Sequence, residues 1–227
     1  YFGEFFANEA ERHNAKSTVD SIRLPVLKNF PIVVPSPKEQ KEIVDYLKQH
    51  CNIPVIIFPG NPSQIYDGAD GLLLLSLISG RNADLLIGRH VEAAPSIKQS
   101  GLEVIPTGYI LIDGGKATSV SYMSNTTPIP SDKSDIAVAT ALAGELLGLK
   151  VIYLEAGSGA KNPVSSEIIS KVSNAVDIPI IVGGGIRSVE QVERAFESGA
   201  NVVVIGTAVE RDSELISMIA ATMKNFA

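Results

Sequence analysis

Short apolar runs alternate, over most of the chain, with longer runs in which apolar residues recur at helical spacing. Apolar runs of about four to eight residues bounded by glycine or proline predict strands, and apolar residues three and four positions apart predict helices. Several predicted strands are apolar at almost every position, which is typical of parallel sheets covered by helices. The six predicted strands are Ile53–Phe58, Gly71–Leu75, Glu103–Ile112, Lys150–Glu155, Pro179–Val182 and Val202–Ile205.

The predicted helices are bounded by residues that cap free backbone groups. A serine followed three residues later by glutamate or glutamine forms a capping box. Such pairs occur at Ser36 and Glu39, with Pro37 as the first helical residue, and at Ser188 and Gln191. The latter helix is expected to stop at a glycine, Gly199. Further helices are expected at Asn82–Ala94 and Ser134–Leu147. The apolar residues expected on one face of the other helices are Ile43, Val44 and Leu47; Ile168, Ile169, Val172 and Val176; and Val189, Val192 and Phe196.

Repeated strand–helix units predict an α/β fold with a parallel sheet. The last two units are short and regular, so a (β/α)8 TIM barrel formed as a single domain by residues 1–227 fits better than an open sheet, although periodicity alone does not decide between them. A barrel needs eight strands, and the first 50 residues would have to provide two more. Ile32–Val34 is a poor candidate for one of them, and Thr18–Phe30 is better interpreted as a helix.

Composition narrows the class of protein. The chain has 227 residues, of which 45% are hydrophobic, which suits one domain with a large core. A formal net charge of -6 without a basic run makes nucleic acid an unexpected partner. The longest apolar run, Leu72–Leu75, is far too short to span a bilayer. A single cysteine, Cys51, excludes an internal disulfide and favours a reducing compartment, so we expect a cytoplasmic protein.

Three successive predicted strands end in glycine: Tyr153–Gly159 (Y-L-E-A-G-S-G), Ile178–Ser188 (I-P-I-I-V-G-G-G-I-R-S) and Val202–Ala208 (V-V-V-I-G-T-A). Glycines between a strand and a helix leave backbone N–H groups free, and the helix N-terminus adds positive potential. Either turn alone could simply be a tight connection. Two in tandem favour phosphate binding, because the loops after the last two strands of a barrel commonly form a phosphate site.

The candidate catalytic residue is Glu155, a carboxylate at the end of a buried strand. Beside a phosphate site it could take a proton from a substrate hydroxyl, or it could be satisfied by neighbouring N–H groups. Tyr153 lies two residues earlier and therefore on the same side of the strand. It could hold a substrate hydroxyl or fill the interior. Asp113-Gly114-Gly115 favours a turn over a catalytic aspartate, and the three histidines lack metal-ligand spacing.

Together, these three glycine-ending segments resemble the geranylgeranylglyceryl phosphate synthase family, which includes the PcrB-type enzymes. The resemblance covers about residues 36–210. It includes three longer and more specific runs, namely Gly71–Asn82 (G-L-L-L-L-S-L-I-S-G-R-N), Pro106–Gly115 (P-T-G-Y-I-L-I-D-G-G) and Ser124–Pro130 (S-N-T-T-P-I-P).

The resemblance implies a TIM-barrel prenyltransferase of ether-type phospholipid biosynthesis. Such an enzyme joins the 3-hydroxyl of sn-glycerol 1-phosphate to carbon 1 of a polyprenyl diphosphate such as geranylgeranyl diphosphate, releases diphosphate with the help of Mg²⁺, and forms a homo-oligomer. Glu155 matches the family's proposed base and Tyr153 a glycerol ligand. The implied substrate-binding residues are Tyr153, Leu154, Glu155, Ala156, Gly157, Ser158, Gly159, Gly184, Gly185, Gly206 and Thr207.

The sequence departs from the family at the metal site. Family members resemble each other in a first strand ending in an Asp-Pro-Asp-type segment that holds Mg²⁺ and a second strand ending in Gly-Gly-Ser, and neither occurs here. Our hypothesis is that two segments are missing, near Ser17 and Thr18 and near Pro31–Val33, which leaves the metal ligands unassigned. Two alternatives stay open: a phosphate-binding sugar-phosphate isomerase, and a degenerate barrel that binds phosphate without turnover.

Overall fold

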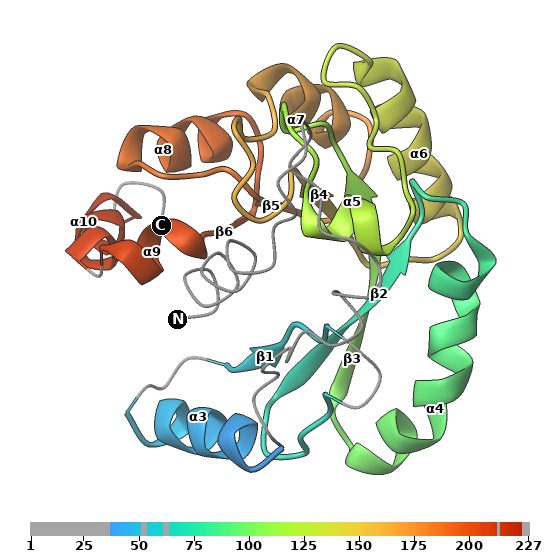
Figure 1. The fold of residues 1–227 in the computed structure, drawn as a ribbon, viewed down its shortest axis with the longest axis vertical. Helices are drawn as coiled ribbons and strands as arrows, with labels where there is room; N and C mark the ends of the chain where they lie inside the picture. The colour runs from blue at the N-terminus through green and yellow to red at the C-terminus, as the bar shows by residue number, and fades with distance from the viewer. Residues whose placement is uncertain (1–36, 51–53, 61–63, 213, 224–227) are drawn as a thin grey trace, which may run out of the picture. The chain divides into compact units, whose positions relative to one another are not determined.

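The structure is a computed structural model that describes residues 37–50, 54–60, 64–212 and 214–223 (Figure 1). The chain divides into two compact units, residues 1–40 and 41–227. All described strands belong to the second unit, and the expectation of a single domain stays a prediction. Within the described residues, no helix is long and apolar enough to cross a membrane.

The second unit is built on a sheet of six parallel strands that lie side by side in chain order. This confirms the six predicted strands and the parallel α/β sheet. The described strands form a half-barrel with helices along the outer face of the curved sheet (Figure 1), and the closed (β/α)8 barrel stays a prediction. The strands are β1 (Ile56–Ile57), β2 (Gly71–Leu77), β3 (Glu103–Leu111), β4 (Val151–Glu155), β5 (Ile180–Gly183) and β6 (Val202–Val204).

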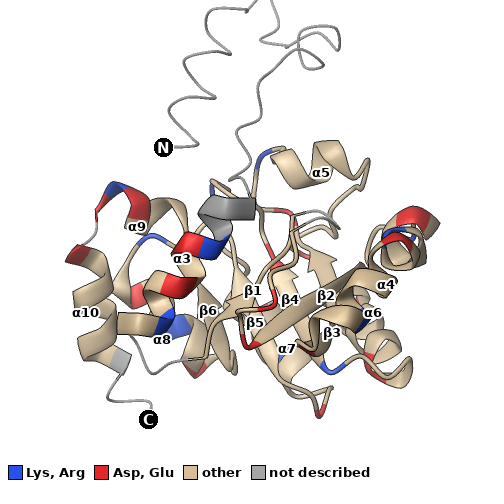
Figure 2. Ribbon diagram, turned by 90° about the horizontal axis from the view of Figure 1, so that it is seen from below, with Lys and Arg blue, Asp and Glu red and all other residues tan. Residues whose placement is uncertain are grey.

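Helices follow most strands and return the chain to the start of the next one. The longer ones, including α4, α6, α7 and α8, surround the sheet, whereas α5 lies beyond the carboxyl ends of the strands (Figure 2). The helices are α3 (Pro37–His50), α4 (Arg89–Ser100), α5 (Ser119–Met123), α6 (Ser134–Leu146), α7 (Ser166–Ser173), α8 (Val189–Glu197), α9 (Thr207–Arg211) and α10 (Glu214–Met223).

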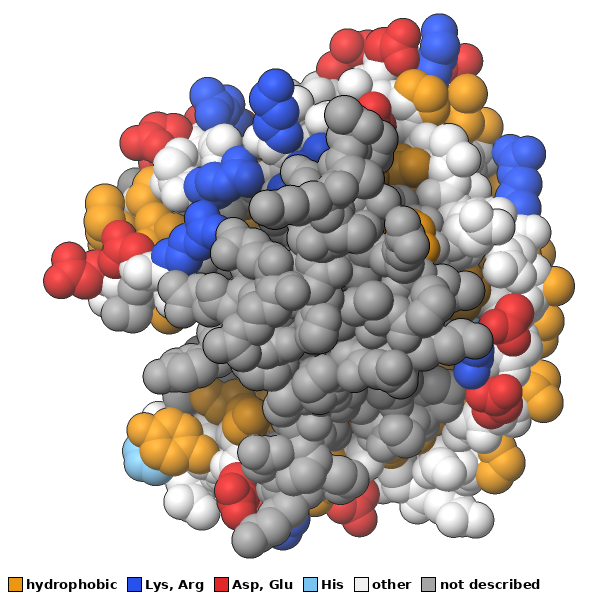
Figure 3. Space-filling model, viewed as in Figure 1, with side chains coloured by type: hydrophobic (Ala, Val, Ile, Leu, Met, Phe, Trp, Pro, Cys, Tyr) orange, Lys and Arg blue, Asp and Glu red, His pale blue; other side chains and the backbone are white. Residues whose placement is uncertain are grey.

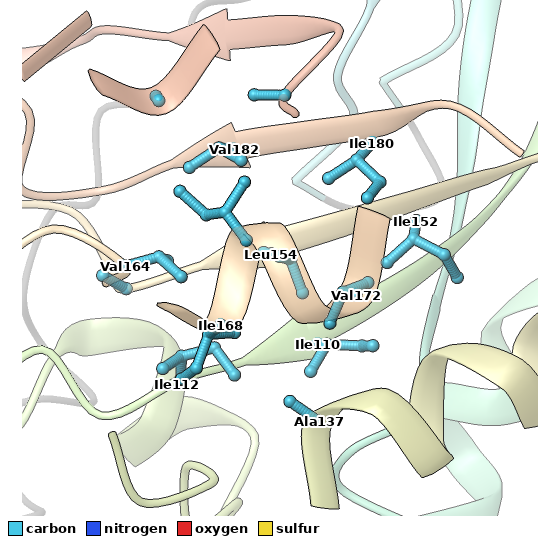
Figure 4. Packing of buried hydrophobic residues seen from close by; sticks show 14 of the residues in the cluster. Ile110, Ile112, Ala137, Ile152, Leu154, Val164, Ile168, Val172, Ile180 and Val182 are labelled. Carbon is cyan, nitrogen blue, oxygen red and sulfur yellow. The ribbon is translucent and has the colours of Figure 1, made fainter. Parts of the chain in front are cut away.

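The core has two layers because alternate strand residues point to opposite faces of the sheet. On the outer face, Ile110, Ile152 and Leu154 are fully buried against the helices, together with Ile168 and Val172 of α7 (Figure 4). On the inner face, the intervening residues form a separate buried cluster: Leu73, Leu77, Tyr109, Leu111, Tyr153 and Ile181. The inner face of the half-barrel is therefore largely apolar, and it includes the two tyrosines Tyr109 and Tyr153.

Three local predictions need correction. The helix expected from Asn82 to Ala94 is a π-helical turn at Asp84–Gly88 followed by α4, which continues through Pro95. Burial of Ala93 and Ile97 against the sheet offsets the hydrogen bond that the proline removes. In α3, only Val44 of the three expected apolar residues is buried, with Ile43 55% and Leu47 38% exposed. Val176 is buried but lies beyond the end of α7.

The capping box expected at Ser188 and Gln191 is also different in detail. Ser188 precedes α8 with extended backbone but makes no side-chain capping bond. The Gln191 Oε1 instead accepts a hydrogen bond from the backbone N–H of Arg187, at 2.6 Å. The expected stop at Gly199 is confirmed, since this residue has φ +105° directly beyond the cap of α8. The loop between β5 and α8 is thus bonded to the first turn of α8 through Gln191.

Candidate active site

Strand β4 delivers two polar side chains to the inner face of the sheet. Tyr153 is 1% and Glu155 7% exposed. Glu155 pairs with Leu111 on β3 and with Gly183 on β5, so it lies at the carboxyl end of three adjacent strands. Its Oε1 accepts a hydrogen bond of 2.6 Å from the backbone N–H of Gly157. The Tyr153 hydroxyl donates a second hydrogen bond to the same carboxylate.

The surroundings of Glu155 favour its protonated form. Burial raises the pKa of the carboxyl above its ordinary value, although the hydrogen bonds from Gly157 and Tyr153 act in the opposite direction. Burial, followed by the nearby charge of Glu155, also raises the pKa of Tyr153, which keeps its hydroxyl as a donor. A buried carboxylate with a raised pKa is suited to accept a proton from a substrate near neutral pH.

The triple-glycine loop that follows β5 lies directly against this pair. A Cβ atom at Gly183 would lie 2.5 Å from the Tyr153 hydroxyl and 2.8 Å from Glu155 Oε2. Gly184 has φ +83°, and a Cβ there would overlap Glu155 Oε1 and lie 2.5 Å from the backbone nitrogen of Gly157. Only glycine fits at these positions, because the backbone of one loop approaches the other without room for a side chain.

The segment Asp113-Gly114-Gly115 is a turn, as the sequence predicts, because the Asp113 carboxylate accepts a hydrogen bond of 2.8 Å from the Gly115 N–H. The sequence did not indicate that this turn also packs against the loop after β4. Asn162 donates its backbone N–H to the Gly114 carbonyl at 2.9 Å, and a Cβ at Gly114 would lie 2.7 Å from the Ala156 carbonyl oxygen. The loops after β3, β4 and β5 therefore form one packed unit.

Gly206 and Thr207 follow β6, which neighbours β5 in the sheet. Val204 of β6 pairs with Gly183, so this turn begins near the triple-glycine loop. Gly206 has φ -109° and a Cβ there would meet nothing within 4 Å. Backbone conformation therefore does not require glycine at this position, and the space beside it is open.

A cavity of about 490 Å³ lies beside Tyr109 on the inner face of the sheet. Apolar side chains of β2, α4 and α5 line most of it, and two of these residues, Leu74 and Leu75, are only half-buried. Phe58 and Tyr109 also line the cavity, and their rings lie 5.6 and 5.1 Å from that of Tyr153. The cavity thus ends beside the residue that holds Glu155.

The polar side chains that line the cavity include those of Arg89, His90 and Ser124. His90 on α4 lies 3.1 Å from the Ser76 hydroxyl, and burial lowers the pKa of the imidazole, which favours its neutral form. Sequence reasoning treated the histidines as scattered and missed this position. The signal was present in the spacing of His90, Ala93 and Ile97, which places these three residues on one face of α4.

Comparison with known proteins identifies the family. The sequence matches the model of the PcrB family over residues 33–224. The chain belongs to the PcrB family. This PcrB-family chain is 57% identical over 179 residues to a geranylgeranylglyceryl phosphate synthase of Chitinophaga pinensis, covering 79% of the chain and 71% of the relative. It is 42% identical over 178 residues to one of Korarchaeum cryptofilum, covering 78% and 73%.

A solved relative supports the same assignment. The crystal structure of (S)-3-O-geranylgeranylglyceryl phosphate synthase from Thermoplasma acidophilum, in complex with sn-glycerol-1-phosphate, superposes with a TM-score of 0.77 at 29% identity. The match covers 96% of the PcrB-family chain and 85% of the solved one. The family assignment and the parallel α/β fold are therefore supported by both sequence and structure.

The first part of the PcrB-family chain has a second match. Residues 1–62 match the model of a Type I restriction modification DNA specificity domain, which overlaps the PcrB match over residues 33–62. This gives a different account of the stretch in which two further barrel strands were sought. The positions near Ser17 and Pro31–Val33, where segments were inferred to be missing, lie outside the described residues. That hypothesis stays a prediction.

The structure brings together most of the predicted site residues of the PcrB chain. Tyr153, Glu155 and Gly157 contact the triple-glycine loop, whereas Gly206 and Thr207 are placed near it by strand order. Leu154 differs, because it is fully buried in the outer core and points away from Tyr153. It can support the site only through its backbone. Within the described residues, no group of three or more His, Cys, Asp or Glu side chains could hold a metal ion.

Proposed function

We propose that this PcrB-family chain is a geranylgeranylglyceryl phosphate synthase. It transfers a prenyl group from a polyprenyl diphosphate such as geranylgeranyl diphosphate to the 3-hydroxyl of sn-glycerol 1-phosphate. The observation that carries this proposal is the place of the buried Tyr153–Glu155 pair, between closely packed glycine loops and the end of an apolar cavity. The relatives that share this function support it.

The glycine loops suit the phosphate end of the acceptor. Gly184 and Gly185 have φ +83° and +73°, and left-handed residues of this kind occur in the backbone concavities that bind anions. Gly157–Gly159 and Gly206-Thr207 would complete the enclosure around the phosphate, with the open space beside Gly206 available for its oxygens. The glycerol then extends from this end toward Tyr153 and Glu155.

In the reaction, the 3-oxygen of the glycerol forms a bond to carbon 1 of the prenyl chain. The bond between carbon 1 and the diphosphate oxygen breaks, and its electron pair leaves with the diphosphate. Glu155 accepts the proton from the attacking hydroxyl, while the Tyr153 hydroxyl holds the carboxylate in place. The two loops orient the acceptor hydroxyl. Such positioning can supply much of the rate enhancement, because the attacking alcohol needs little further activation.

The cavity suits the prenyl donor. Its volume of about 490 Å³ and its leucine-rich wall on β2 match an apolar chain rather than a sugar phosphate. Phe58 and Tyr109 lie where the cavity meets Tyr153, so carbon 1 would arrive beside the acceptor hydroxyl. The apolar wall favours a prenyltransferase over the sugar-phosphate isomerase that the glycine turns alone leave open.

Mg²⁺ is part of the proposal, because a hard cation neutralises the charge that develops on a leaving diphosphate. No group of three or more His, Cys, Asp or Glu side chains that could hold the ion occurs among the described residues. A closed (β/α)8 barrel, a homo-oligomer, a cytoplasmic location and peripheral membrane contact are further proposals. The barrel rests on the regular strand–helix units and on family resemblance, the oligomer on resemblance, the location on the single cysteine, and the membrane contact on the lipid substrate.

The test is a product assay with the purified chain, sn-glycerol 1-phosphate, geranylgeranyl diphosphate and Mg²⁺. We expect prenylated glycerol phosphate, none with the enantiomeric sn-glycerol 3-phosphate, and none after chelation of the metal. Calorimetric binding of glycerol 1-phosphate without product would instead support the binding-only barrel. Isomerisation of a sugar phosphate without prenyl transfer would support the isomerase.

A further inference from the structure

Arg187 connects the two glycine loops of the site. Its Nη1 donates hydrogen bonds to the Lys161 carbonyl at 3.0 Å and to the Gly185 carbonyl at 3.4 Å, and its Nη2 donates to the Ala160 carbonyl. Ala160 and Lys161 belong to the loop after β4, and Gly185 to the loop after β5. One guanidinium therefore spans both walls of the phosphate site.

The backbone of Arg187 is fixed as well. Its N–H donates to Gln191 Oε1 in the first turn of α8. The two loops that it joins are already in contact, since a Cβ at Gly185 would lie 2.7 Å from the Asn162 carbonyl oxygen. A small movement of either loop would therefore change the spacing of the N–H groups that face the phosphate.

The charge of Arg187 is not cancelled by its partners, because all three side-chain acceptors are carbonyl oxygens. Among the described residues, no carboxylate forms an ion pair with it. Figure 3 shows that Lys and Arg side chains gather around α8 on this face of a chain whose net charge is -6. The loops are therefore held together by a cation close to a site for a dianion.

We propose that Arg187 is a positioning residue for the acceptor phosphate, which it affects by fixing the distance between the loops after β4 and β5. The inference rests on the proposed function. The guanidinium makes three hydrogen bonds to carbonyl oxygens of these loops, and its proposed action is therefore through the loops rather than by direct contact with the substrate. Loss of the guanidinium should weaken glycerol 1-phosphate binding and leave the prenyl donor unaffected.

The test compares R187K and R187Q with R194Q, a matched control on an exposed arginine of α8. Both Arg187 variants should raise the KM for glycerol 1-phosphate about 10- to 100-fold, the range expected for lost hydrogen bonds to a charged group. The KM for the prenyl diphosphate and kcat should change less than about 2-fold, which is within the usual effect of a surface substitution. R187K decides the mechanism, because an ammonium keeps the charge but cannot bridge three carbonyls.

Wild-type KM values in R187K would overturn the positioning role, since charge alone would then suffice. Equal rises in both KM values, or in R194Q, would also overturn it. Thermal unfolding checks that each variant is folded, and R187K, which keeps most of the side-chain stem, serves if R187Q is not. Calorimetric titration with inorganic phosphate separates the two proposals. Weaker phosphate binding in R187K supports the inference even if the wild type makes no prenyl product, and unchanged binding overturns it.

Discussion

The close approach of the two glycine loops can be tested at Gly184, with Gly148 as a matched control. Both residues have a left-handed backbone, with φ +83° and +88°. An alanine at either position costs about 1–2 kcal/mol because its Cβ crowds the following carbonyl oxygen. The two differ in their surroundings, since a Cβ at Gly148 meets nothing within 4 Å, whereas one at Gly184 overlaps Glu155 Oε1.

The extra cost at Gly184 follows from what surrounds it. The Glu155 carboxylate could rotate away, but the backbone nitrogens of Gly157 and Ala156, at 2.5 and 2.9 Å, cannot move without displacing the loop. Overpacking of this kind adds about 1–3 kcal/mol. We therefore expect G148A to lose about 1–2 kcal/mol of unfolding free energy from its strained backbone, and G184A to lose about 2–5 kcal/mol.

Urea denaturation measures both variants, with the midpoint and slope fitted separately so that a change in unfolded-state compactness is not counted as stability. Prenyl transfer measured on the same samples should be retained in G148A and largely lost in G184A, because a displaced Glu155 no longer meets the acceptor hydroxyl. Equal losses of stability in the two variants would refute the reasoning. The loops would then separate freely, and their contact would not constrain the site.

Other predictions concern the base and the cavity. E155Q should keep glycerol 1-phosphate binding in calorimetry and lose most turnover; unchanged turnover would remove Glu155 as the base. Burial raises the pKa of Glu155 above its ordinary value of 4.5. The unfolding free energy of the wild type should therefore fall, and its kcat should rise, as the pH increases from 4.5 through the raised pKa. The unfolding free energy of E155Q, measured by urea denaturation, should not fall over the same pH range. A93F, which fills the cavity from α4, should shorten the longest prenyl chain accepted in a product-length assay, whereas unchanged lengths would place the chain elsewhere.

The sequence predicts the sheet well because burial on both faces leaves long apolar runs, as in β2 and β3. The position of Glu155 beside Tyr153 also follows from the two-residue repeat of a strand. The end of α4 is harder to predict, because the packing of Ala93 and Ile97 against the sheet lets the helix continue through Pro95. The residues next to Pro95 in the sequence do not reveal that packing.

The contacts that complete the site lie between segments distant in sequence. The cavity takes its lining from β2, α4 and α5, and nothing in any one of these indicates an empty space between them. The bonds from Arg187 to the loop after β4 join residues 26 and 27 positions apart. A glycine pattern predicts that backbone N–H groups are free, but it does not predict what holds two such loops at a fixed spacing.

The order of the strands has a consequence for synthesis of the protein. Each described strand pairs only with its neighbours in the chain, so β1 and β2 can pair before β3 has left the ribosome. Contacts between consecutive strands close segments of a single strand–helix unit, and the entropy cost of closure rises only slowly with segment length. Each new strand then pairs with the exposed edge of the strand before it. This limits the time during which that edge could pair with another nascent chain.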